Sequence, residues 1–155
     1  MKPLSIITVI LAVILVAAFA WTTRTTPVKT TTSLGTTSDI QTHIDSLMNS
    51  KNEYAFLIIT LKGTLNFIQF TGDKSGAQLD FPLITDRQKE LKKTFKETAN
   101  ELGLNVIENK GADGSDFLDI NIHDSSKEIA KISIIFMERL FNITPNSKLE
   151  FEYDL

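Results

Sequence analysis

Residues 54–61 read YAFLIITL, a run in which only one side chain, that of Thr60, is clearly polar. An apolar run of this length, rich in β-branched residues, is typical of a central strand that is covered on both faces. Lys62-Gly63 then predicts a tight turn into residues 64–70, so the two segments are expected to form a β-hairpin. A third strand is expected over residues 78–83, where apolar side chains alternate.

Three further segments have apolar side chains at helical spacing, and each begins with a capping signal. They cover residues 38–49, 85–102 and 125–141. The first two begin with candidate capping boxes, which pair Ser38 with Gln41 and Thr85 with Gln88. Gly103 is expected to end the second helix.

The remaining segments return to the period of a strand. Residues 104–108 and 116–123 form a second candidate pair, joined by the turn-forming sequence NKGADGS. Residues 148–155 alternate between apolar and charged side chains. The predicted order is therefore α-β-β-β-α-β-β-α-β, an α+β fold in which helices pack on one largely antiparallel sheet.

The amino-terminal segment predicts contact with a membrane. From Leu4 to Ala20 the chain reads LSIITVILAVILVAAFA, and a helix of this length spans about 26 Å, which is at the lower limit for crossing the hydrocarbon core. Residues 1–21 are therefore a signal anchor or a cleavable signal peptide that is cut after Ala20. Trp21 and Arg24, placed as in an interfacial belt, favour the anchor. We expect a single-pass membrane protein with an extracytoplasmic domain, or a secreted or periplasmic protein if the segment is removed.

Residues 22–37 read TTRTTPVKTTTSLGTT and contain few apolar side chains. Because such a segment cannot bury enough surface to offset its ordering entropy, we expect a flexible Thr-rich linker before a globular domain over residues 38–155. Three of the 16 bases, Lys2, Arg24 and Lys29, precede the domain, which keeps 13 bases and all 19 acids and has a net charge of −6. A surface of that sign repels phosphate backbones, so no nucleic-acid partner is expected.

The composition also excludes several kinds of functional site. The chain has no Cys, which excludes disulfides, thiolate nucleophiles and Cys-ligated metals, and its two imidazoles are His43 and His123. We therefore expect no cofactor and no enzymatic activity. One alternative stays open, an exported hydrolase in which His123 acts with Asp119 or Asp124, because acid-base catalysis requires such a pair. His43 is expected on the surface.

Over residues 40–141 the order of elements resembles the type III secretion chaperone-like fold, which includes the YbjN-like and TY-Chap domains. The sequences that support the resemblance are FLII at 56–59, FIQF at 67–70, LDFPL at 79–83 and ELGL at 101–104. The membrane segment before this region and the strand after it depart from that family. The resemblance implies binding of a protein or peptide, often by a homodimer, instead of catalysis.

The third predicted helix has more apolar side chains than one contact with a sheet requires. Its second apolar face consists of Ala130, Ile134, Met137 and Phe141. Either another element of the same chain covers this face, or the face binds a partner or a second copy. We expect a membrane-tethered or exported binding module that uses these four residues. A structural subunit of an envelope complex, assembled through Leu4–Ala20, is the alternative.

Overall fold

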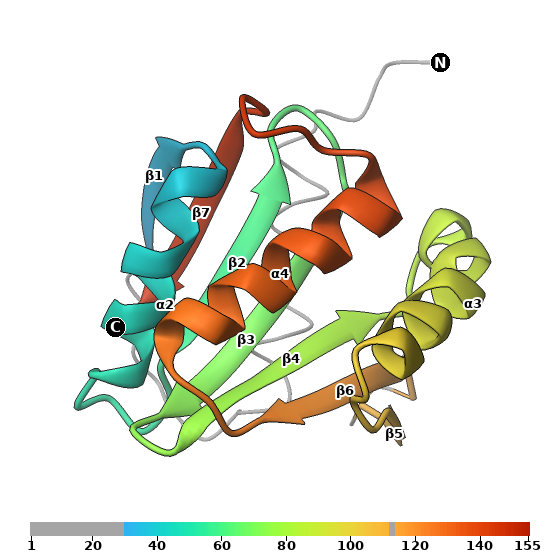
Figure 1. Cartoon of the computed structure of the whole chain (residues 1–155), viewed down its shortest axis with the longest axis horizontal. Coiled ribbons are helices and arrows are strands. Elements are labelled where there is room, and N and C mark those ends of the chain that lie inside the picture. The colour runs from blue at the N-terminus through green and yellow to red at the C-terminus, as the bar shows by residue number, and fades with distance from the viewer. Residues whose placement is uncertain (1–29, 112–113) are drawn as a thin grey trace.

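The computed structural model describes residues 30–111 and 114–155, which form a seven-stranded sheet with helices packed on it (Figure 1). The expected α+β fold with an antiparallel sheet is confirmed. The elements are β1 (Thr31–Gly35), the 3-10 helix η1 (Thr37–Asp39), α2 (Ile40–Met48), β2 (Phe56–Leu61), β3 (Phe67–Asp73), β4 (Gly76–Pro82), α3 (Asp86–Glu101), β5 (Ile107–Lys110), β6 (Asp116–Ile122), α4 (Ser126–Phe141) and β7 (Leu149–Asp154).

The strands lie in the order β1-β7-β2-β3-β4-β6-β5, and every neighbouring pair is antiparallel. The predicted hairpin is present as β2 and β3, with Ile58 opposite Gln69. Strand β7 lies between two strands from the other end of the described chain, because Leu149 pairs with Gly35 of β1 and with Leu61 of β2.

The core lies on one face of the sheet. Alternate side chains of β2, β3, β4 and β6 are buried there under α2, α4 and α3, which lie side by side across this face (Figure 1). Phe95 of α3 connects the layers, since its ring centroid lies 5.1 Å from that of Phe81 in β4 and 4.7 Å from that of Phe136 in α4. Aromatic pairs at such distances add to the energy of burial.

Capping explains where the helices begin. The Thr85 hydroxyl accepts a hydrogen bond from the backbone N–H of Gln88, and the Gln88 side-chain oxygen accepts one from the backbone N–H of Thr85, so the second predicted capping box is confirmed. The first box is wrong in register: the capping pair is Thr36 with Asp39, whose carboxylate accepts from the Thr36 backbone N–H at 2.8 Å. The chain therefore passes through η1 first and enters α2 at Ile40.

The prediction that Ala130, Ile134, Met137 and Phe141 form a partner surface is wrong. Ala130, Met137 and Phe141 are buried, with exposed fractions of 4%, 0% and 8%, and Ile134 is half-buried. The physical reason is that α4 lies between α2 and α3 as well as on the sheet, so three neighbours cover its wide apolar stripe. The alternative expectation, that the same chain covers this face, describes α4 correctly.

The expected linker is also corrected over its last part. Residues 31–35 are the edge strand β1, in which Thr31 pairs with Tyr153 and Ser33 with Phe151. Thr is β-branched and therefore favours strands. The edge of β7 supplies the backbone hydrogen bonds that residues 31–35 cannot make alone.

The candidate membrane segment, residues 1–21, and the first part of the linker lie outside the described residues. Among residues 30–111 and 114–155, no helix has the length and apolar character to span a membrane.

Candidate functional site

The sheet face opposite the helices carries a row of side chains that crosses four strands. The register aligns Phe56 with Thr71, Thr71 with Gln78, and Gln78 with Asn121. Neighbouring strands lie about 4.8 Å apart, so the row extends about 14 Å. Within the part of the chain that the structure describes, no helix lies on this face (Figure 1).

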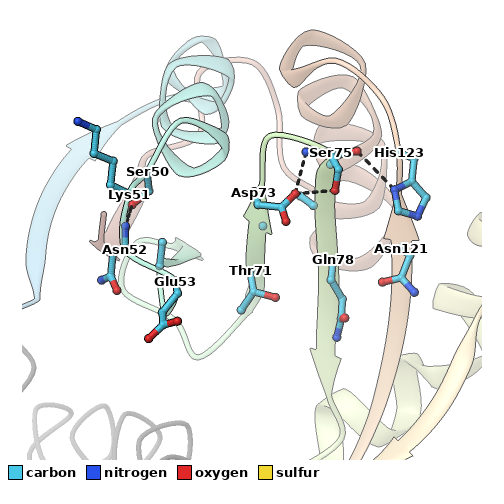
Figure 2. Close-up of a pocket in the computed structure, with 14 residues that line it drawn as sticks. Ser50, Lys51, Asn52, Glu53, Thr71, Asp73, Ser75, Gln78, Asn121 and His123 are labelled. Atoms are coloured by element: carbon cyan, nitrogen blue, oxygen red, sulfur yellow. Dashed lines mark hydrogen bonds between the residues drawn. The ribbon is translucent and has the colours of Figure 1, made fainter.

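Three members of this row, Thr71, Gln78 and Asn121, line a hollow of about 530 Å³ (Figure 2). Its walls are the loop between α2 and β2 at residues 50–53, the β3–β4 hairpin between residues 71 and 78, and Asn121 and His123 at the end of β6. Figure 2 shows Thr71, Gln78 and Asn121 on three neighbouring strands, and the 50–53 loop facing them across the hollow.

The hairpin wall is held by short-range hydrogen bonds. The Asp73 carboxylate accepts from the backbone N–H of Ser75 at 2.7 Å and from its hydroxyl at 2.6 Å, and these bonds hold the pKa of Asp73 below its usual value. Gly76 follows with a φ of +150°, and a Cβ there would overlap the carbonyl oxygen of Ile122. Only glycine allows β4 to approach β6 so closely at this point.

The opposite wall is a polar turn. The Ser50 hydroxyl accepts a hydrogen bond from the backbone N–H of Asn52 at 3.0 Å, and the Asn52 side chain accepts one from the N–H of Tyr54 at the same distance. Such bonds shape a loop without regular secondary structure. In both walls, therefore, side chains accept hydrogen bonds from backbone N–H groups two residues further along the chain.

The geometry does not assemble the hydrolase site considered from the sequence. His123 is exposed, and its Nδ1 lies 3.4 Å from the carbonyl oxygen of Ser75. Asp119 is four residues away along an extended chain, about 13 Å, and accepts a hydrogen bond from Asn109 instead. Asp124 accepts from the backbone N–H of Ser125 at 2.6 Å. Neither carboxylate orients the imidazole, so the acid-base pair is not formed.

His43 does not occupy the surface position expected for it. It is half-buried and stacks on Phe151, with ring centroids 4.1 Å apart, and its Nε2 lies 3.4 Å from the Ser33 hydroxyl. Burial lowers the pKa of His43, which favours the neutral ring. His43 thus packs α2 onto β7, on the face opposite the hollow.

Across residues 30–111 and 114–155, no three His, Asp or Glu side chains gather as they would around a metal ion. The sequence did not point to Thr71, Gln78 and Asn121. The available signal was a polar residue at every second position of otherwise apolar strands, but only the strand register shows that the three are neighbours.

The chain matches no family model, and neither a curated protein nor a solved structure is significantly similar to it. The resemblance to the type III secretion chaperone-like fold therefore stays a prediction from the quoted residues.

Proposed function

We propose that the chain is a non-enzymatic binding module, tethered to a membrane or exported, that holds an extended segment of another protein in the hollow. The row of Thr71, Gln78 and Asn121 supports this function, because it places one hydroxyl and two amide side chains in line. Amides and hydroxyls both donate and accept hydrogen bonds, as the peptide groups of an extended chain require.

The dimensions of the row fit such a partner. Three neighbouring strands place these side chains about 10 Å apart from first to last, the length of about three residues of extended chain. Phe56, half-buried at the end of the row, adds an apolar contact. Recognition through hydrogen-bonding side chains and one aromatic ring does not depend on a strongly charged partner.

The amino-terminal segment supports delivery of the domain across a membrane. The apolar run from Leu4 to Ala20 is a signal anchor or signal peptide by its composition. The partner in this proposal is therefore a protein met outside the cytoplasm, and the resemblance to chaperone-like binding domains agrees with such a role.

Site-directed crosslinking of the full chain in native membranes tests the proposal. A photoreactive side chain at Asn121, exposed on the rim of the hollow, is expected to capture a partner, whereas one at Gln41, exposed on α2, is not. Thr71→Arg places a long side chain across the hollow and should abolish the capture from Asn121. Equal capture at both positions, or capture that survives Thr71→Arg, contradicts binding in the hollow.

The same experiment separates the alternative function. A structural subunit of an envelope complex would keep its association in Thr71→Arg and lose it when Leu4–Ala20 is replaced by an unrelated membrane span.

A further inference from the structure

The sheet face opposite the helices has an apolar middle. Ile58 of β2, Phe67 of β3 and the register partners Pro82 of β4 and Phe117 of β6 alternate with core residues and therefore lie on this face. We call these four residues the apolar patch; it crosses four neighbouring strands, about 14 Å. None of the four belongs to the core cluster under the helices, and none lines the hollow. The apolar patch is thus a separate surface.

The apolar patch needs a second layer over it. The run at residues 54–61 is apolar on both sides, as in strands that are covered on both faces. Within residues 30–111 and 114–155, helices cover only the other face (Figure 1). Ile58 and Phe67 nevertheless have exposed fractions of only 8% and 7%. Because monomeric proteins rarely leave a large apolar patch in water, an occupant for this face has to be found.

The charges around the apolar patch restrict its occupant. Every ionisable side chain that alternation and register place on this face of the strands is acidic: Asp73, Asp80, Asp119, Glu150, Glu152 and Asp154. The bases Lys62 and Lys148, and also His123, lie just beyond the ends of strands. Two copies packed face to face would bring these acids together, which disfavours a second copy. The fitting occupant is apolar and carries bases without acids.

The amino-terminal residues of the same chain have this composition. Leu4–Ala20 is almost wholly apolar, and the flanking charges are the bases Lys2, Arg24 and Lys29. No acid occurs before the globular domain. The segment therefore matches the patch in both apolar character and charge.

The segment is also long enough to reach the patch. The chain enters the sheet at β1, which lies five strand spacings, about 24 Å, from β6. Residues 21–29 can extend to about 30 Å, so every part of the patch is within reach. A short tether of this kind gives an effective concentration on the order of millimolar at the patch.

We propose that Leu4–Ala20 docks on the apolar patch of its own chain whenever it is not in lipid. The same apolar side chains make both contacts, so docking and membrane insertion exclude each other. Docking removes the segment from water before it meets a membrane. Insertion, or cleavage after Ala20, then leaves the patch bare.

Photocrosslinking of the full chain, synthesised in vitro without membranes, tests the proposal. A benzophenone side chain in place of Phe117 is expected to form an adduct with Leu4–Ala20 of the same chain, identified by mass spectrometry. The same group at Gln41, exposed on α2, should not. Synthesis in the presence of phosphatidylcholine vesicles should remove the adduct.

Three results of this experiment overturn the proposal. The first is the absence of an adduct with Leu4–Ala20 from position 117, and the second is an equal yield from position 41. The third is an adduct that joins two copies, detected in a mixture of isotope-labelled and unlabelled chains, because the occupant is then a second copy. An adduct that persists with vesicles refutes the exclusion between docking and insertion.

Dye binding gives an independent readout, since its sign differs between a docked and a free segment. Replacing Leu4–Ala20 by a Gly/Ser segment of equal length bares the patch, so the fluorescence of bis-ANS without lipid should rise several-fold. If the segment lies free in water, its replacement lowers the fluorescence instead, which overturns the proposal. A control that replaces residues 22–29 by Gly/Ser but keeps Arg24 and Lys29 should leave the fluorescence unchanged. Far-ultraviolet circular dichroism checks that both variants fold, and the crosslinking experiment requires neither of them.

Discussion

The close approach of two strands at Gly76 leads to a quantitative prediction. Gly76 has a φ of +150°, and an added Cβ would lie 3.0 Å from the Cα of His123 and would overlap the Ile122 carbonyl oxygen. Carbon and carbonyl oxygen normally stay at least about 3.3 Å apart, so Gly76→Ala must push β4 away from β6. The backbone conformation costs about 1–3 kcal/mol, and the overlap adds about 1–3 kcal/mol. We expect Gly76→Ala to lower the free energy of unfolding by about 2–6 kcal/mol.

Gly63 supplies the matched control. It also has a positive φ, +78°, but an added Cβ would have no atom within 4 Å. Gly63→Ala should cost only the left-handed conformation, about 1–2 kcal/mol. Both substitutions reduce the entropy of the unfolded chain equally, so that effect cancels in the comparison.

Urea unfolding of the full chain, followed by far-ultraviolet circular dichroism, measures both variants. If the urea concentrations at the unfolding midpoints of the two variants fall by the same amount, with unchanged m values, then the close approach at Gly76 is not the reason that glycine is needed there. A larger loss of stability in Gly76→Ala than in Gly63→Ala would confirm the contact between β4 and β6 that shapes the hairpin wall of the hollow.

Three further predictions concern the helices. Thr85→Ala removes the cap of α3 and should lower the free energy of unfolding by about 1 kcal/mol in urea, while Thr85→Ser should restore it. Phe95→Ala should lower it by about 3–5 kcal/mol, because the fully buried ring touches both Phe81 and Phe136; a cost under 1 kcal/mol would mean that α3 does not depend on this contact. The pKa of His43 is lowered by burial, so the folded state binds fewer protons and stability should fall as the pH drops below 6.5. In thermal unfolding experiments, the stability of His43→Phe should not fall in this way below pH 6.5. If it falls as much as in the wild type, another group is responsible for the loss of stability.

The sequence predicted the parts of the fold that depend on local patterns. Residues 85–102 carry a cap, a helical period and a terminal glycine, and the helix begins and ends within a residue of the prediction. The apolar run at 54–61 likewise predicted β2 and its hairpin. These signals are local because capping and alternation involve residues only a few positions apart.

The errors involve partners that are distant along the chain. β1 was missed because a Thr-rich stretch becomes a strand only when it pairs with β7, about 120 residues later. The wide apolar stripe of α4 fitted both a partner surface and a buried helix, and only the positions of α2 and α3 distinguish the two. The hollow was missed for the same reason, since its walls come from three separate segments.

The position of β7 has a consequence for how the domain is completed. This strand follows every other described element along the chain, yet it fills the space between β1 and β2. During synthesis, β1 has no strand to pair with until the six residues of β7 have emerged. The seven-stranded sheet is therefore complete only once β7 is in place, whereas β2, β3, β4, β6 and β5 can pair with one another before then.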